Sequence, residues 1–238
     1  SFDRDMPEEI NRMVTDILAD LLLTTSVEAE ENLLREGVDA DKIHFVGNVM
    51  IDSLRYYEQD IAKSKILEEL SLRSGSFALM TLHRPSNVDE ETSLRDLLEA
   101  IGEAGRQMPV VWPIHPRTRE RIESFGIDVG SLGFLLTEPL GYYDFQHLLA
   151  ESRLVLTDSG GIQEETTVLG VPCLTLRKNT ERPVTCTIGT NRLVGTDPDA
   201  IRQAIAEALS GDPRPGQIPP LWDGHAAERM VEVLKEWS

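Results

Sequence analysis

The chain has 238 residues, 40% of them hydrophobic, and a formal net charge of −18 at pH 7. This length and composition fit a globular protein of one large or two ordinary domains and exclude global disorder. The negative charge argues against nucleic acid and anionic membranes as partners, because both are polyanions, but it leaves a small nucleotide ligand open.

Cysteine content and targeting signals bear on disulfides, metal sites and the cellular compartment. Cys173 and Cys186 are too few for a disulfide framework, and they lack the spacing of metal ligands. The sequence shows no signal peptide and no apolar run near 18 residues, so we expect a cytoplasmic protein.

The predicted elements of the first quarter are mainly helical. Apolar residues recur at helical spacing from Ile10 to Leu21, after Pro7 and two glutamates that suit a first turn. A short helix over 26–36, a strand over 43–46 and a Gly-Asn turn follow. Residues 49–72 then show a charged helical pattern.

From residue 77 onward, strands and helices alternate. The predicted strands are 77–82, 110–114, 134–136, 153–157, 172–176 and 192–194. The predicted helices are 93–107, 118–125, 144–150, a segment after Gly161, 199–209 and, beyond a connector rich in proline and glycine, 225–237. Such alternation implies right-handed βαβ crossovers, so we predict an α/β fold with a Rossmann-like parallel sheet.

One strand–turn–helix junction stands out, the stretch from Leu154 to Glu165. Its apolar strand ends in Asp-Ser-Gly-Gly and continues into a helix-compatible segment. Glycines let a ligand approach the main chain closely, and the free N–H groups of a first helical turn bind phosphate. An ordinary capped helix has the same pattern, and these residues alone leave the two interpretations evenly balanced.

Other polar residues follow the predicted strands at the same edge of the sheet. They are His83-Arg84 after the first strand, His115 after the second, and 177–183 after the fifth. Ligands of open α/β sheets bind at the carboxyl ends of the strands. A basic edge in an acidic chain predicts an anionic ligand with more than one phosphate. Glu165 is either a ribose acceptor or a solvated helix glutamate.

Together these residues resemble the non-hydrolysing UDP-N-acetylglucosamine 2-epimerases, which have two Rossmann-like domains of the glycosyltransferase-B type. The stretches that match the family are Pro7–Arg12, Gly47-Asn48 with Ile51-Asp52, Thr81–Arg84, His115-Pro116, Thr157–Glu165 and Leu176–Pro183 with the run to Gly195. The resemblance extends over essentially the whole chain.

The resemblance implies a role for each candidate site residue. Glu8 and His83 are the implied catalytic residues, with His83 near the diphosphate. The implied UDP-sugar contacts are Ser159, Gly160 and Gly161 at the diphosphate, Glu165 at the ribose, Arg182 at the phosphate or sugar, Phe145 and Leu140 at the uracil, and His115. The family implies no metal and no other cofactor.

The resemblance also implies a domain organisation. Residues 1–48 would be the end of the first Rossmann-like domain, 49–222 a complete UDP-binding domain, and 223–238 a terminal helix that returns toward the first domain. The family's opening Gly-Thr-Arg-Pro-Glu turn and two further carboxylates do not precede Ser1, so we expect a chain shortened at its N-terminus. A homodimer is the expected full-length assembly. Many members carry a glutamate after the His-Arg pair, where this chain has Pro85-Ser86-Asn87, and another after Thr-Glu-Arg-Pro, where it has Val184; both departures weaken the case for a regulatory second sugar-nucleotide site.

The implied reaction interconverts UDP-N-acetylglucosamine and UDP-N-acetylmannosamine by elimination and re-addition of UDP. This chain would carry the UDP-binding half and be inactive alone. Two alternatives stay open. A nucleotide-binding module without catalysis fits the missing acid–base groups, whereas a UDP-sugar transferase of the same architecture is disfavoured by the Thr-Glu-Arg-Pro and Pro-Glu-Glu runs.

Overall fold

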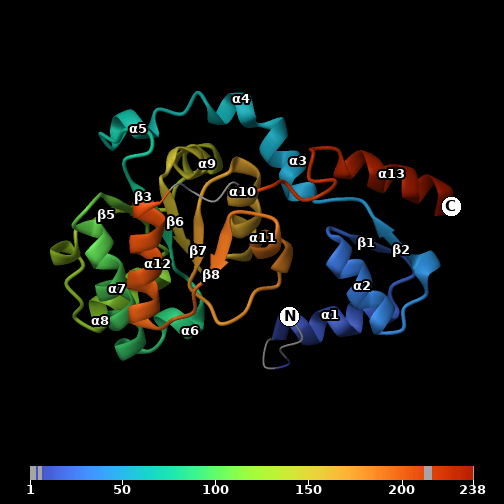
Figure 1. The fold of residues 1–238 in the computed structure, drawn as a ribbon, viewed down its shortest axis with the longest axis horizontal. Helices are drawn as coiled ribbons and strands as arrows, with labels where there is room; N and C mark the ends of the chain where they lie inside the picture. The colour runs from blue at the N-terminus through green and yellow to red at the C-terminus, as the bar shows by residue number, and fades with distance from the viewer. Residues whose placement is uncertain (1–3, 5–6, 212–215, 238) are drawn as a thin grey trace. The chain divides into compact units, whose positions relative to one another are not determined.

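A computed structural model describes residues 4, 7–211 and 216–237 (Figure 1). The chain forms two compact units. Unit 1 consists of residues 1–56 and 218–238, and unit 2 of residues 57–217.

Unit 1 is built around two short parallel strands. Its elements are α1 (Pro7–Leu18), β1 (Leu22–Thr24), α2 (Val27–Arg35), a 3₁₀ turn (Ala40–Lys42), β2 (Ile43–Phe45), α3 (Val49–Tyr56) and α13 (Ala226–Trp237). Strand β1 pairs with β2 in parallel register, Leu22 opposite Ile43. The prediction of a helix through Leu21 is wrong at its end, because the apolar run there enters a strand. Short apolar runs fit either element, and here the pairing partner decides.

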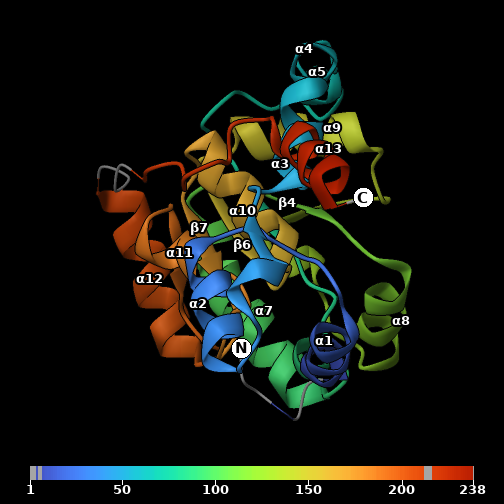
Figure 2. The same cartoon turned by 90° about the vertical axis from the view of Figure 1, so that its right-hand side faces the viewer.

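The C-terminal segment of unit 1 is fixed by polar contacts to residues far away in sequence. The buried Trp222 donates its indole N–H to the Thr25 carbonyl over 2.8 Å. Asp52 accepts the backbone N–H groups of Ala226 and Ala227, at 3.0 and 2.7 Å, and so caps the first turn of α13. Helix α13 therefore lies beside α3 (Figure 2).

Unit 2 contains a six-stranded parallel sheet, which confirms the predicted α/β class. Its strands are β3 (Ala78–Thr81), β4 (Val110–Pro113), β5 (Phe134–Thr137), β6 (Leu154–Thr157), β7 (Cys173–Thr175) and β8 (Asn191–Leu193). They lie in the order β5-β4-β3-β6-β7-β8, which is the Rossmann order. All six strands are parallel. Successive strands are added outward on one side of the centre from β3 through β4 to β5, and on the other side from β6 through β7 to β8.

The helices of unit 2 were predicted in part. The longer ones are α7 (Glu91–Gly105), α8 (Pro116–Ser124), α9 (Tyr142–Glu151), α10 (Gly160–Leu169) and α12 (Pro198–Ser210). The short ones are α4 (Glu58–Ile61), α5 (Ile66–Glu69), α6 (Pro85–Val88), α11 (Pro183–Thr187) and a 3₁₀ turn (Gly130–Leu132). The helical pattern over 49–72 is thus broken into three pieces. Ser64 contributes to the break, because its hydroxyl bonds the Ile66 N–H and the Asp144 carboxylate instead of facing solvent.

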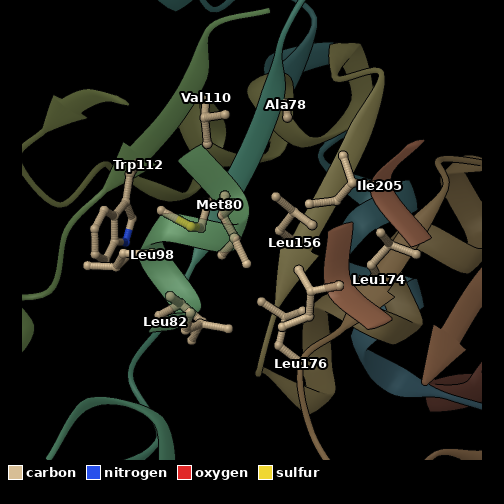
Figure 3. Packing of buried hydrophobic residues seen from close by; sticks show 14 of the residues in the cluster. Ala78, Met80, Leu82, Leu98, Val110, Trp112, Leu156, Leu174, Leu176 and Ile205 are labelled. Carbon is tan, nitrogen blue, oxygen red and sulfur yellow. The ribbon is translucent and has the colours of Figure 1, made fainter. Parts of the chain in front are cut away.

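The sheet of unit 2 has apolar side chains on both faces, as expected where helices cover both. Alternate strand residues (Ala78, Met80, Val110, Trp112, Leu154 and Leu156) pack with α7, α8 and α12. Figure 3 shows Met80, Leu98 and Leu156 in this layer. The residues between them (Phe77, Leu79, Val111, Val155) pack with α5, α9 and α10. This arrangement leaves the strand ends as the positions where polar side chains gather.

Gly47 occupies a position that a side chain cannot share. Its φ is +93°, and a Cβ there would lie 2.1 Å from the Leu221 carbonyl oxygen, which belongs to the same unit. Gly37 is a matched control, since its φ is +89° but a Cβ would meet no atom within 4 Å.

We expect Gly47→Ala to lower the free energy of unfolding by more than about 3 kcal/mol, because the backbone itself must move. Gly37→Ala should lose only about 1 to 2 kcal/mol, the usual cost of the left-handed conformation. Urea unfolding followed by tryptophan fluorescence measures both. Equal losses in the two variants would show that the contact with Leu221 is unimportant.

Candidate functional site

The candidate site lies where β3 and β6 end side by side. The connections after these two central strands lead to opposite sides of the sheet, which makes this edge the switch point where open α/β sheets bind ligands. Thr81 and Thr157 are paired in register there, with their hydroxyl oxygens 2.7 Å apart. The segments around His83 and Ser159 begin directly beyond this pair.

Asp158 joins the two strand ends, and its side chain is fully buried. Its carboxylate accepts the backbone N–H groups of His83 and Arg84, the latter over 2.9 Å, and the Asn87 amide over 3.1 Å. Burial alone would raise the pKa of Asp158, but the hydrogen bonds and charge of the His83 side chain and the two backbone N–H groups outweigh it and hold this pKa below its ordinary value. Asp158 is therefore an ionised anchor for the turn after β3.

Asp158 also orients the His83 ring. His83 Nδ1 lies 2.9 Å from Asp158 Oδ1, and the histidine side chain is about half exposed. With Nδ1 held by the carboxylate, Nε2 lies on the opposite edge of the imidazole. His83 therefore presents a fixed ring next to the start of α10.

The N-terminus of helix α10 has no side-chain cap. Ser159 is the N-cap residue, but its hydroxyl makes no capping hydrogen bond, and the first turn carries no acidic residue. The Ser159 N–H instead bonds the Thr157 hydroxyl over 3.0 Å. The first N–H groups of the helix and the positive end of its dipole are thus available to an anion.

Three consecutive residues of α10, Gln163 to Glu165, each contact a different part of unit 2. Gln163 is fully buried and bonds the Thr180 hydroxyl, whereas Glu164 Oε1 lies 2.5 Å from Arg182 Nε. Glu165 accepts the Gln146 side-chain amide over 2.7 Å, which links α10 to α9. The Gln-Glu-Glu sequence therefore positions the segment that carries Arg182 and the helix that carries Phe145.

Glu165 has an unusual protonation equilibrium. Burial raises its pKa to about 7, the charge of Glu164 adds to the rise, and the hydrogen bond from Gln146 opposes it. Phe145 precedes Gln146 on α9, and both Phe145 and Leu140 pack partly against the core on this side of the sheet. The residues predicted at the ribose and uracil thus come from neighbouring elements.

The loop before Arg182 is braced by a second ion-pair network. Arg177 is buried and forms two hydrogen bonds to Glu181, at 2.7 and 2.8 Å, and Arg84 reaches the same carboxylate over 3.4 Å. Burial opposes ionisation of Glu181, but the hydrogen bonds from Arg177 outweigh it and lower its pKa to about 2. The negative charge of Glu181 is thus balanced by the neighbouring arginines. This carboxylate stands close to the start of α10, since one of its oxygens would lie 3.9 Å from a Cβ placed on Gly160.

Two predicted residues take no part in the hydrogen bonds and ion pairs described above. His115 follows β4 at the same edge, but its Nδ1 accepts the Arg117 N–H over 3.3 Å and caps α8. Glu8 is exposed in the first turn of α1, in unit 1. Their predicted roles stay predictions.

Several residues of the site were not singled out from the sequence. Asp158 was visible as part of the Asp-Ser-Gly-Gly turn, and a polar residue at a buried strand end was the available signal. Gln163 and Thr180 lie in stretches that match the family, but neither they nor Gln146 indicated which residues they bond, because those partners are distant in sequence.

Among the residues that the structure describes, none of the helices combines the length and the apolar character that crossing a bilayer requires. Among the same residues, no three His, Cys, Asp or Glu side chains are grouped so that they could hold a metal ion.

Comparison with known proteins identifies close relatives. The UDP-N-acetylglucosamine 2-epimerase of Methanococcus maripaludis is 35% identical over 244 residues, and the UDP-2,3-diacetamido-2,3-dideoxy-D-glucuronate 2-epimerase of Pseudomonas aeruginosa is 41% identical over 241 residues. Each alignment covers 98% of this chain. The chain spans only 66% and 65% of the length of these two relatives.

A solved structure agrees over the same extent. The crystal structure of Methanocaldococcus jannaschii UDP-GlcNAc 2-epimerase in complex with UDP-GlcNAc and UDP matches with a TM-score of 0.89 at 37% identity, covering 99% of this chain and 66% of that one. The family model for UDP-N-acetylglucosamine 2-epimerase matches residues 1–235. The chain therefore belongs to the UDP-N-acetylglucosamine 2-epimerase family.

Proposed function

We propose that unit 2 binds the UDP part of UDP-N-acetylglucosamine and that the protein takes part in epimerising this sugar at C2 to give UDP-N-acetylmannosamine. The observation that carries the proposal is the uncapped start of α10 at the sheet's switch point, beside the His83–Asp158 pair. The relative from Methanocaldococcus jannaschii, crystallised with UDP-GlcNAc and UDP, supports it.

The proposed diphosphate contacts come from three parts of unit 2. The N–H groups at Ser159, Gly160 and Gly161 provide the positive end of a helix dipole, Arg182 a guanidinium and His83 an imidazole edge. These groups are held in place before a ligand arrives. Such preorganised positive potential stabilises a diphosphate that leaves with the bonding electrons.

The proposed nucleoside contacts come from α9, from the segment just before it, and from α10. The Glu165 carboxylate would accept hydrogen bonds from the ribose hydroxyls, the Phe145 ring would pack on the uracil, and the Leu140 backbone would line the base. These three contacts would select a uridine nucleotide rather than a bare diphosphate.

The proposed reaction needs no free carbanion at C2, because loss of the C2 proton is coupled to departure of UDP from C1. A base takes that proton, its electrons form a C1–C2 double bond, and the bond from C1 to UDP breaks, which gives a 2-acetamidoglucal. UDP then adds back at C1 while an acid delivers a proton to the other face of C2. Glu8 is this chain's proposed contribution to the carboxylates that carry the proton.

Arg182→Ala tests the diphosphate assignment. We expect the affinity for UDP to fall about ten- to a hundredfold, since a charge-assisted hydrogen bond to phosphate is lost. Arg192→Ala is the matched control, because Arg192 pairs with Glu207 on the surface. Calorimetric titration with UDP measures both variants. Arg182→Ala binding as tightly as Arg192→Ala would refute the assignment.

Glu165 makes the proposed binding depend on pH. An accepting carboxylate must be ionised, so UDP affinity should rise as the pH rises through about 7. The pKa of Glu165 in the folded chain is raised above the ordinary 4.5, so the folded state holds its proton more tightly than the unfolded state. The free energy of unfolding should therefore fall as the pH rises from about 4.5 to about 7, by up to roughly 3 kcal/mol in total, and stay lower above pH 7.

The matched control for this effect is Glu165→Gln, which keeps the shape and a hydrogen bond to Gln146. The phosphate of UDP itself titrates near pH 6, so only the difference between the two proteins reports on Glu165. Calorimetry at several pH values should show a steeper rise in wild type. Identical pH profiles would contradict a ribose contact by an ionised Glu165.

Exchange of the C2 hydrogen should be assayed with two substrates, UDP-N-acetylglucosamine and a diacetamido glucuronate nucleotide. The second is the substrate in the name of the Pseudomonas aeruginosa relative, which is 41% identical to this chain, whereas the Methanococcus maripaludis relative is 35% identical. This chain alone should bind UDP but exchange little or no C2 hydrogen in deuterated water with either nucleotide, because it carries only the UDP-binding half. The Methanococcus maripaludis relative, as positive control, should exchange the C2 hydrogen of UDP-N-acetylglucosamine. Exchange by this chain with the glucuronate nucleotide and not with UDP-N-acetylglucosamine would reassign the substrate, and exchange as fast as that of the relative would contradict the expected inactivity.

A further inference from the structure

We infer that Gln163 and Thr180 form a hydrogen-bonded relay that fixes Arg182 relative to the start of α10, so that both act as positioning residues for the diphosphate. The inference rests on the proposed function and adds to it how the two halves of the anion site are kept in register. Neither residue is itself expected to touch the ligand.

The relay starts at the N-cap of α10. Gln163 Nε2 donates to the Ser159 carbonyl oxygen over 3.0 Å. Gln163 Oε1 accepts the Thr180 hydroxyl over 2.6 Å, and the Thr180 oxygen in turn accepts the Arg182 N–H over 3.0 Å. One neutral amide therefore links the residue that opens the helix to the backbone of the arginine.

The other side of the Arg182 backbone is held in the same way. Its carbonyl oxygen accepts the Thr185 hydroxyl over 2.7 Å and the Thr185 N–H over 3.0 Å. Asn191, at the start of β8, donates from Nδ2 to both Gln163 Oε1, at 3.0 Å, and Thr185 Oγ1, at 3.1 Å. Both backbone polar groups of Arg182 are thus fixed by threonines that converge on two buried amides.

Only a neutral amide suits the position of Gln163. It is fully buried and must donate to a carbonyl at one end while accepting two hydrogen bonds at the other. A glutamate would bring a buried negative charge beside Glu164, could not donate to Ser159 when ionised, and would oppose an anion at the helix start. The chemistry of the side chain therefore fits a link between two parts of an anion site.

Thr180→Val tests the relay, because it removes the hydroxyl and keeps the shape. Thr187→Val is the matched control, since the Thr187 hydroxyl bonds carbonyl groups of Pro183 and Val184 within its own helix. We expect Thr180→Val to weaken UDP binding roughly three- to tenfold. Uridine, which lacks phosphate, should bind both variants like wild type in saturation-transfer NMR.

A double-mutant cycle separates positioning from general destabilisation. In an Arg182→Ala background, Thr180→Val should cause no further loss of UDP affinity, because the group that it positions is gone. Thr180→Ser keeps the hydroxyl and should restore binding, which decides the matter if the valine variant does not fold. Gln163→Met should repeat the pattern of Thr180→Val.

Three outcomes would overturn the inference. Thr180→Val and Thr187→Val could weaken UDP equally, Thr180→Val could weaken uridine as much as UDP, or its effect could add fully to that of Arg182→Ala. If Arg182→Ala weakens UDP and Thr180→Val does not, the relay fails and the proposed function stands. If wild type binds UDP no more tightly than uridine, the proposed function fails and the relay with it.

Discussion

The buried carboxylate of Asp158 is the constraint on which the candidate site depends. It stands at the end of β6 yet receives hydrogen bonds from His83, Arg84 and Asn87, all beyond the end of β3. A buried ionised carboxylate is stable only when its donors are in place, so the two strand ends cannot separate without leaving it unpaired. The same carboxylate also holds Nδ1 of the His83 ring, which couples the stability of unit 2 to the geometry of its site.

Helix α10 extends this constraint outward from the sheet. Its N-terminus is left open, whereas Gln163, Glu164 and Glu165 hold three different neighbours. Glu164 and Glu165 are both buried, and the cost of burying each carboxyl group is offset differently. Glu164 has the Arg182 guanidinium, whereas Glu165 has a neutral amide and an elevated pKa of about 7. This difference suits one carboxylate to orient an arginine and the other to respond to a ligand that donates hydrogen bonds.

Much of unit 2 could be predicted from its sequence because the signals there are local. Apolar runs such as Leu154 to Leu156 between turns marked the strands, and alternation with helices implied the parallel sheet. Unit 1 was harder. The run near Leu22 fits a helix or a strand, and only pairing with β2 decides between them. The helical pattern over 49–72 failed for a similar reason, since Ser64 bonds a carboxylate on α9.

The sequence by itself determined the fold class, the family and the open glycine-rich start of α10, because each depends on residue types at short spacing. Only the tertiary structure decided which polar residues meet. Asp158 bonds a histidine 75 positions earlier, and Asn191 bonds Gln163 across 28 positions. Such partners are set by the order of strands in the sheet, to which no local pattern in the sequence refers. The protonation of Glu165 belongs to the same class, because burial by packing, rather than the residue's own chemistry, raises its pKa.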